Sequence, residues 1–241
     1  MKCNGAVTVV FVVCAAMLSA AEYPKDLYVN RPDLVVYVPR KPITHQWKKG
    51  CDDIVSKRQR GDSYNDHFQV LDDRARGLLY AFWTQATWEG CTDMHIAFSK
   101  SADNGRTWTE PVVLAGSENR ANPKLTASWQ QPMLSASGRL YCLWNQQIGW
   151  GGQLCGWLYG IWSDDGGETW SAPKKIDFAE RMDLDHPNRT LPPAWCNWQR
   201  PLRLGEGGRY FVGCSRHGKA PYDLRGGTKV EFWQFENIDE T

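Results

Sequence analysis

The sequence has 241 residues, a net charge of +1, 42% hydrophobic residues and 23% charged residues. This balance is typical of a folded globular chain, and it argues against a disordered protein and against a surface that follows a nucleic-acid backbone. Thirteen tryptophans are the unusual feature, because so many need either a large core or a surface that stacks on flat ligands such as sugars.

Residues 1–21 have the pattern of a secretory signal peptide. Lys2 is followed by the apolar run Ala6–Leu18, and Ser19 and Ala21 supply small side chains at the −3 and −1 positions of a cleavage site. The run is shorter than the roughly 20 apolar residues of a membrane-spanning helix, although an uncleaved anchor is the alternative. We therefore expect a secreted or periplasmic protein without a stable membrane span.

Beyond the leader, the sequence predicts short strands and turns, with no convincing helical periodicity. One strand pattern occurs three times, as GLLYAFWTQ at Gly77–Gln85, as GRLYCLWNQ at Gly138–Gln146 and more loosely as GRYFVGCSR at Gly208–Arg216. A segment of polar and aromatic residues precedes each copy, and two further short strands follow it. The three preceding segments are NDHFQ (Asn65–Gln69), SWQQP (Ser128–Pro132) and NWQRP (Asn197–Pro201).

Each repeated unit therefore holds about four short strands within about 60 residues. Four antiparallel strands repeated at a fixed period are typical of the blades of a β-propeller. A blade buries its two faces against its neighbours and is not stable alone. The predicted fold class is all-β, a propeller of four-stranded blades.

An octapeptide of the form S-x-D-x-G-x-T-W also occurs twice, as SADNGRTW and as SDDGGETW. Asp and Ser side chains can close a tight turn, Gly can take its positive φ, and Trp can fill the gap between blades. We therefore assign the octapeptide to structure rather than to calcium binding or catalysis, since the Glu and helices of an EF-hand are missing. The structural positions are Ser101, Asp103, Gly105, Thr107, Trp108, Ser163, Asp165, Gly167, Thr169 and Trp170.

The two octapeptides resemble Asp-boxes, also called bacterial neuraminidase repeats. With the order of strands and the W-Q-x-P segments, they make the chain similar to the sialidase-like propeller family from about Pro32 to the C-terminus. The resemblance implies six blades, an exported glycoside hydrolase and a glycan substrate. Residues 22–241 accommodate only three to four blades, so we interpret them as a partial propeller. Three interpretations stay open: the sequence is truncated, two chains pair to complete the propeller, or the chain forms a compact four-bladed ring.

The segments that begin the innermost strands are the candidate site, because ligands of propellers commonly bind at one mouth of the axis. Trp can stack on a sugar ring and Gln can bond its hydroxyls, although both could equally wedge blades together and satisfy backbone groups. The candidate catalytic residues are Asp66 and His67. The candidate substrate-binding residues are Gln69, Trp129, Gln130, Gln131, Trp198, Gln199, Arg200 and Arg216.

The resemblance implies roles for some of these residues. Sialidases hold a sugar carboxylate with three arginines, use an Asp as acid and base, and have a Tyr nucleophile. Arg200 and Arg216 match two arginines of this clamp and Asp66 matches the acid, but no residue matches the nucleophile and the F-R-I-P motif is absent. Two alternatives to a glycosidase therefore stay open. One is a non-catalytic carbohydrate-binding propeller, and the other is a polysaccharide lyase in which His67 abstracts a proton.

Six cysteines follow the leader. An exported chain can oxidise them, in any of 15 connectivities, and a buried free thiol is an equal alternative at Cys142. The spacings Cys91-x3-His95 and Cys214-x2-His217 are a weak zinc pattern. We predict no metal or cofactor, and the sequence leaves the oligomeric state open.

Overall fold

The computed structural model describes residues 64–116, 126–148, 155–177, 181–205, 208–218 and 227–240. All of them belong to one compact unit, Val35–Thr241. The predicted signal peptide and Cys51 lie outside the described residues. Within them every regular element is a strand, so this part of the chain holds no helix that could cross a membrane.

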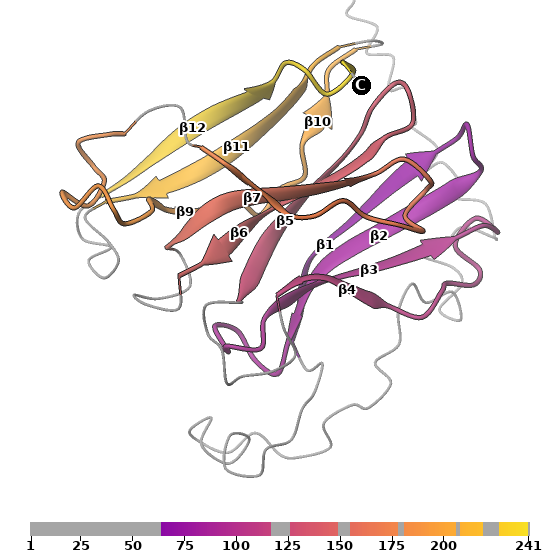
Figure 1. Ribbon diagram of the computed structural model, residues 1–241, viewed down its shortest axis with the longest axis horizontal. Coiled ribbons are helices and arrows are strands. Elements are labelled where there is room, and N and C mark those ends of the chain that lie inside the picture. The colour runs from indigo at the N-terminus through magenta and orange to yellow at the C-terminus, as the bar shows by residue number, and fades with distance from the viewer. Residues whose placement is uncertain are drawn as a thin grey trace, which may run out of the picture. The chain divides into compact units, whose positions relative to one another are not determined.

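The twelve strands form three four-stranded antiparallel sheets that follow one another along the chain (Figure 1). We call them the first, second and third sheets. The first contains β1 (Tyr64–Asp73), β2 (Leu78–Ala86), β3 (His95–Ser101) and β4 (Val112–Gly116). The second contains β5 (Ala127–Leu134), β6 (Leu140–Gln147), β7 (Gly156–Ser163) and β8 (Lys174–Ile176). The third contains β9 (Ala194–Cys196), β10 (Leu202–Arg203), β11 (Tyr210–His217) and β12 (Thr228–Phe235).

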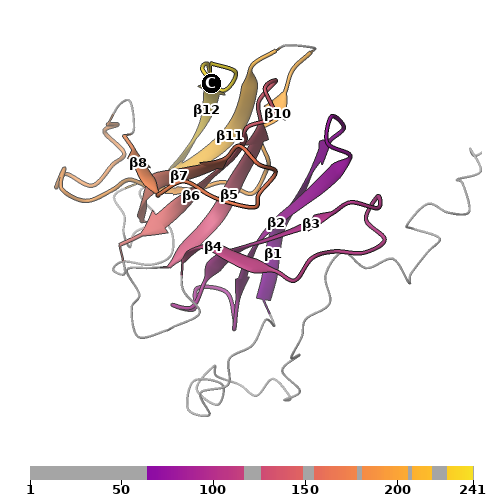
Figure 2. The same ribbon diagram turned by 45° about the vertical axis from the view of Figure 1, so that its right-hand side comes forward.

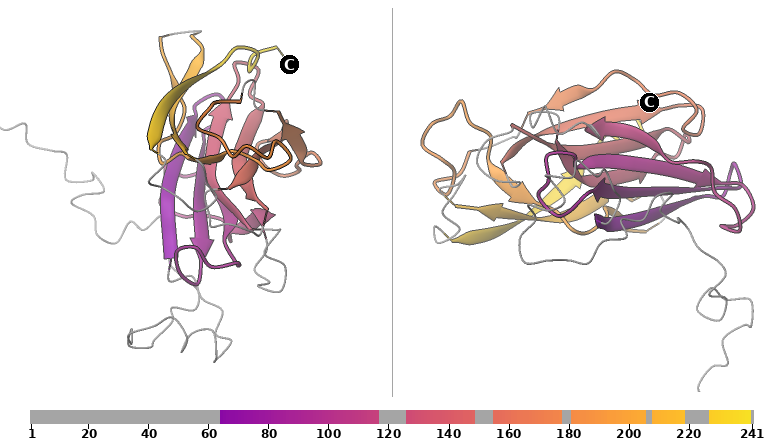
Figure 3. Two further views of the ribbon diagram at one scale, coloured as in Figure 1. Left: turned by 90° about the vertical axis from the view of Figure 1, so that its left-hand side faces the viewer. Right: turned by 90° about the horizontal axis from the view of Figure 1, so that it is seen from below.

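The second sheet lies between the other two (Figures 2 and 3). One face of the first sheet, with Tyr80, Phe82 and Phe98, packs against Cys142 and Trp144 of the second. The opposite face of the second sheet, with Met133 and Leu143, packs against Trp195 and Tyr210 of the third. Each sheet thus buries apolar surface against the next one, which is the main source of stability in such an array.

The third sheet differs from the others in its innermost strand. β9 and β10 both pair with β11, at Cys196↔Ser215 and Leu202↔Phe211. The segment between them, residues 197–201, is not paired with β11. These observations confirm the predicted all-β fold with four-stranded blades, three of which the structure describes.

The two octapeptides form the same turn at the end of the third strand of a sheet. In the second copy, Ser163 donates to Asp165 at 2.7 Å, and the Thr169 N–H donates to the same carboxylate at 2.9 Å. Gly167 has a φ of 81°, and a Cβ placed on it would lie 2.5 Å from Phe98. Gly is therefore required there both by the backbone and by the contact with the first sheet.

The first copy has the same bonds, from Ser101 to Asp103 at 2.8 Å and from the Thr107 N–H to Asp103 at 2.8 Å. Hydrogen bonds from Thr107 and Ser101 lower the pKa of Asp103 to about 2. The carboxylate is thus held in its charged, bond-accepting form at neutral pH. In both copies, the shared Ser, Asp and Thr residues are hydrogen-bonded to one another within the turn.

Candidate functional site

A bulge interrupts the inner strand at the same place in the first two sheets. The register shifts between Asp66 and Gln69 in β1, and between Ser128 and Gln131 in β5. His67 and its counterpart Trp129 both have a φ of 55°, in the left-handed region that non-glycine residues rarely adopt. Bulges and strained backbone conformations are frequent next to functional sites, so this repeated bulge makes the inner-strand start a candidate site.

The bulges bring the predicted site segments together around the inner strands. Gln69 donates to the Gln130 carbonyl at 3.2 Å, and the Gln130 amide donates to the His67 carbonyl. From the unpaired segment between β9 and β10, Arg200 donates to the Val70 carbonyl of β1 at 2.6 Å. The segment between β9 and β10, 130 residues away in sequence, therefore contacts the inner strand of the first sheet.

His67 is more than nine-tenths buried, and neither ring nitrogen has a hydrogen-bond partner among the described residues. Its Nε2 lies 3.4 Å from the Asp66 carboxylate, which is itself exposed, and its ring meets Trp129 edge to face at 6.3 Å. Burial lowers the pKa of His67, while the charges of Asp66 and Glu89 oppose this effect. The imidazole is therefore held neutral beside a solvent-facing carboxylate, an arrangement suited to moving a proton.

Tyr64 is a further member of this group that the sequence analysis missed. Its hydroxyl donates to Asp66 at 2.9 Å, so the carboxylate lies between a phenol and an imidazole. Burial, followed by the bond to Asp66, raises the pKa of Tyr64. The two residues lie two positions apart in β1 and share a face of the strand, so a Tyr-x-Asp pattern was the signal available in the sequence.

Gln130 has a different environment from Asp66. It is fully buried, its Oε1 accepts from Thr84 at 2.9 Å, and Thr84 in turn accepts from the Trp129 N–H at 3.2 Å. In the second sheet, Asn145 takes the place of Thr84 and donates to the Trp195 carbonyl at 3.2 Å. The second strand of one sheet thus bonds to the inner strand of the next sheet. These bonds support the structural interpretation of the Trp-Gln pairs, in which they join blades rather than bind a sugar.

Trp129 is buried as well, and its ring packs 6.5 Å from that of Trp195. The third sheet contrasts with this arrangement, because Trp198, Gln199 and Arg200 are all exposed. The exposed fraction of Trp198 is 59%, a large apolar surface for one aromatic ring. Among the candidate residues, those that are exposed are Asp66 of β1 and residues 198–200 between β9 and β10.

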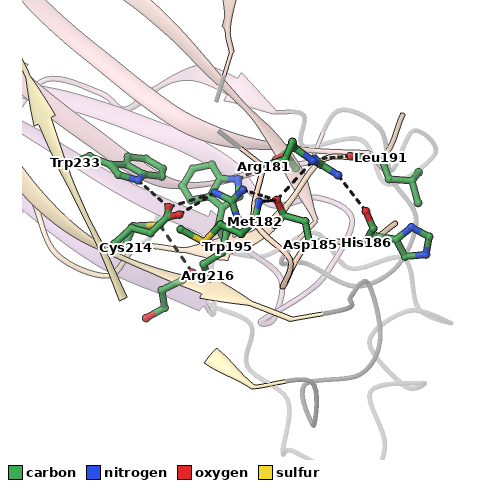
Figure 4. Close-up of polar contacts among 12 residues, drawn as sticks. Arg181, Met182, Asp185, His186, Leu191, Trp195, Cys214, Arg216 and Trp233 are labelled. Atoms are coloured by element: carbon green, nitrogen blue, oxygen red, sulfur yellow. Dashed lines mark hydrogen bonds and ion pairs between the residues drawn. The ribbon is translucent and has the colours of Figure 1, made fainter. Parts of the chain in front are cut away.

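Arg216 lies at the centre of a buried charge network (Figure 4). It donates to both oxygens of Asp185 at 2.8 Å and to Glu231 at 3.2 Å. Arg181 approaches the same Asp185 carboxylate at 3.5 Å. Burial would raise the pKa of Asp185, but the bonds from Arg216 and from the Met182 N–H lower it overall.

This network decides what Arg216 can contribute to ligand binding. Its side chain is only 1% exposed, and that of Asp185 is 2% exposed. To grip the carboxylate of a sugar, Arg216 would need Asp185 and Glu231 to move aside. The environment of Arg216 thus differs from that of Arg200, which is exposed and contacts β1.

The cysteines of the described residues are all buried free thiols, as the sequence analysis allowed for Cys142. Cys91 packs beside the first sheet, whereas Cys214 and His217 belong to the third. Within the third sheet, the Cys196 sulfur lies 3.3 Å from Nε2 of His217. No three His, Cys, Asp or Glu side chains of the described ranges are grouped to hold a metal ion.

The BNR repeat-like domain family matches residues 77–211, more than half of the sequence. The protein belongs to this family, which confirms the predicted relationship to sialidase-like propellers. No curated protein matches the chain.

Solved structures with the same fold include two sialidases. The Hadza microbial sialidase Hz136 has a TM-score of 0.57 and 13% identity, over 75% of this chain and 37% of its own. A Trypanosoma rangeli sialidase in complex with sialic acid has a TM-score of 0.50 and 13% identity, over 76% of this chain and 30% of its own. A Dyadobacter fermentans protein of unknown function has a TM-score of 0.50 and 14% identity, over 73% of this chain and 52% of its own. The chain spans about half or less of each of these proteins, and identities this low establish the fold alone.

Proposed function

We propose that this protein is the partial propeller of a secreted, sialidase-like glycoside hydrolase that acts on glycan chains at the meeting point of its inner strands. Family membership and the sialidase fold of the solved neighbours support the general class. The observation that carries the assignment of the site is the environment of His67. The imidazole of His67 is buried on a left-handed backbone, has no hydrogen-bond partner among the described residues and lies next to an exposed carboxylate, so it has no evident structural duty.

In this proposal Asp66 is the group that exchanges a proton with the glycosidic oxygen. Its carboxylate is exposed, so a substrate can reach it, and Tyr64 and His67 lie on either side. His67 and Tyr64 position this group and exclude water from one side of it.

Substrate binding is proposed for the exposed segment of the third sheet. The ring of Trp198 offers an apolar face for a sugar ring, and Gln199 offers donors and acceptors for hydroxyls. Arg200 is the exposed cation that a carboxylate-bearing sugar would meet, and it is already anchored beside β1. Gln69, Trp129 and Gln130 are buried, so in this proposal they support the neighbouring inner strands rather than contact the glycan.

The test uses the chain with a fluorogenic sialoside and with a panel of immobilised glycans. We expect hydrolysis that falls at least about 100-fold in Asp66→Asn, because a positioned proton donor is lost. Trp198→Ala should weaken glycan binding about tenfold or more, whereas Trp198→Phe, which keeps a stacking ring, should bind nearly normally. A chain that binds none of the glycans and cleaves none of them would contradict the proposal.

One observation favours a second candidate, a polysaccharide lyase. Burial keeps His67 neutral at pH 7, and a neutral imidazole is the form that can remove the proton next to a uronate carboxylate. A lyase would release an unsaturated product with new ultraviolet absorbance from uronate polysaccharides and would be inactivated by His67→Gln. Cleavage of the sialoside with His67→Gln still active would rule this candidate out.

A further inference from the structure

The first octapeptide contains an asparagine that is followed directly by a glycine, Asn104–Gly105. After the predicted signal peptide, no other asparagine of the sequence precedes a glycine. Such a pair is prone to deamidation, because glycine has no side chain that shields its backbone nitrogen from the side chain of the preceding Asn. The side chain of Asn104 is exposed, so water reaches it. The turn therefore contains every group that this reaction needs.

The reaction requires no partner other than water. The backbone nitrogen of Gly105 loses its proton and bonds to Cγ of Asn104, the bond from Cγ to the side-chain nitrogen breaks, and that nitrogen leaves as ammonia with the proton. The product is a cyclic imide, a succinimide. Water then opens the ring at either carbonyl carbon, which leaves aspartate or isoaspartate in place of the asparagine.

The folded turn opposes the first step of this reaction. The Gly105 N–H donates to Ser101 Oγ at 2.9 Å, so the proton that must leave is held in a hydrogen bond to a different side chain. The carbonyl of Gly105 is held as well, because it accepts from Trp108 Nε1 at 3.0 Å. Gly105 is thus fixed on both sides, and the bond to Ser101 has to break before its nitrogen can attack Asn104.

The second octapeptide forms the same turn without the reactive pair. Gly166 takes the place of Asn104, and both have a positive φ, 72° and 58°. The Gly167 N–H donates to Ser163 Oγ at 2.8 Å, as the Gly105 N–H does to its own serine. Glycine satisfies the left-handed backbone at this position without supplying an amide side chain. The two copies therefore share the turn and differ in this one reactive group.

The isoaspartyl product does not fit the turn. In isoaspartate the chain continues through Cβ and Cγ, so the backbone before Gly105 gains one carbon atom and a free carboxylate is left at the side. The added atom displaces the Gly105 N–H from Ser101. The added charge follows directly after Asp103, whose pKa is lowered to about 2 by hydrogen bonds from Thr107 and Ser101. Two neighbouring negative charges then repel each other at neutral pH.

We propose that Asn104 is a site of spontaneous deamidation, that the closed octapeptide turn suppresses the reaction, and that isoaspartate formed while the turn is open prevents it from closing again. Brief local opening is thereby converted into permanent damage. The turn lies between β3 and β4, so the modified chain is loosened at the outer strands of the first sheet. The second sheet is protected from this reaction, because its octapeptide has Gly166 instead.

The test follows the full chain by peptide mass spectrometry during incubation in mildly alkaline buffer. A methyltransferase that acts on isoaspartyl residues distinguishes the two products. We expect the peptide that contains Asn104 to react at least about tenfold faster in the chain unfolded by urea than in the folded chain. Ser101→Ala should raise the rate in the folded chain at least about fivefold, because it removes the hydrogen bond that holds the Gly105 N–H. Ser163→Ala is the matched control, since it makes the same change in the second octapeptide and should leave the rate at Asn104 unchanged.

Substitutions of Asn104 separate the chemistry from the structure. Asn104→Gly copies the second octapeptide and should abolish the modification while the fold is kept. Asn104→Asp supplies the aspartyl product on a normal backbone and should melt close to the wild type. The isoaspartyl fraction of an aged wild-type sample should melt several degrees lower, because its turn cannot close.

Circular dichroism checks that each variant is folded. If Ser101→Ala does not fold, the wild-type rate in increasing urea below the unfolding transition replaces it, and this rate should rise with the urea concentration. Equal rates in the folded and unfolded chains, or an unchanged rate in folded Ser101→Ala, overturn the proposal. None of these measurements depends on the binding or cleavage of a glycan, so this inference fails separately from the proposed function.

Discussion

Asp185 and Arg216 form a bidentate ion pair, with two contacts of 2.8 Å, inside the third blade. Their side chains are 2% and 1% exposed, so neither charge is solvated by bulk water. A buried pair of this kind is tolerated only while the two charges compensate each other. The ion pair also joins the segment before β9 to β11, because Asp185 belongs to that segment and Arg216 belongs to β11, where it pairs with Trp195 of β9.

Removing one charge of this pair should destabilise the fold strongly. Asp185→Asn leaves the Arg216 guanidinium without its main partner, and we expect the free energy of unfolding to fall by about 3–5 kcal/mol. Asp183→Asn is the matched control, since Asp183 is exposed and belongs to the same loop. Urea denaturation measures both. Equal effects of the two substitutions would show that the ion pair does not hold the blade.

His67 should make stability depend on pH in mildly acidic solution. Burial lowers its pKa below the ordinary 6.5, against the opposing charges of Asp66 and Glu89. As the pH falls, the unfolded chain therefore takes up this proton first. The contribution of His67 is fully present above about pH 6.5 and is lost as the pH decreases toward the folded-state pKa.

The measurement for this effect compares the wild-type chain with His67→Asn, by urea denaturation at several values between pH 8 and pH 5. We expect the wild type to lose more stability over this range than the variant. Burial also lowers the pKa of His217, so the variant should keep part of the dependence. Parallel curves for the two proteins would show that His67 is not protected from protonation in the folded state.

Trp170 should contribute more to stability than its repeat partner Trp108. The ring of Trp170 meets Phe82 and Phe98 edge to face at 6.4 and 5.3 Å and joins two sheets. Trp170→Ala should lower the free energy of unfolding by about 3 kcal/mol, because it opens a cavity between the sheets. Trp108→Ala, measured by the same thermal and chemical denaturation at low protein concentration, should cost clearly less. A larger loss for Trp108 would reverse this assignment.

The octapeptide carboxylates should be structural rather than catalytic. Asp165 accepts from the Thr169 hydroxyl and N–H and from Ser163, and these bonds lower its pKa. Asp165→Ala should therefore lower the melting temperature by several degrees while glycan binding is unchanged at temperatures where the variant is folded. Asp177→Ala, an exposed carboxylate after β8, is the control. A loss of glycan binding without a loss of stability would contradict the structural role.

Local patterns in the sequence were sufficient to predict the blades. The octapeptides hold their hydrogen bonds within eight residues, and the strand repeats show their alternation over short distances, so both are visible without a structure. The position of the candidate site at the inner-strand starts followed from the same repeat.

The geometry of the site depends on longer-range pairing that no local pattern encodes. The left-handed backbone of His67 and Trp129 arises from a bulge whose register is set by the neighbouring strand. The contact of Arg200 with Val70 joins two sheets, and the burial of Arg216 depends on Asp185 from a loop 31 residues away. Sequence alone therefore grouped Arg200 with Arg216, and the structure places them in different environments.

The two junctions between sheets each contain one free cysteine, Cys142 in the first and Cys214 in the second. A thiol reagent can reach either sulfur only when the surrounding sheets separate, since both are completely or almost completely buried. The rate at which each cysteine is labelled would therefore report the opening of its own junction. Labelling of Cys214 before Cys142 would show that the third sheet separates first, whereas equal rates would show that the three sheets separate together.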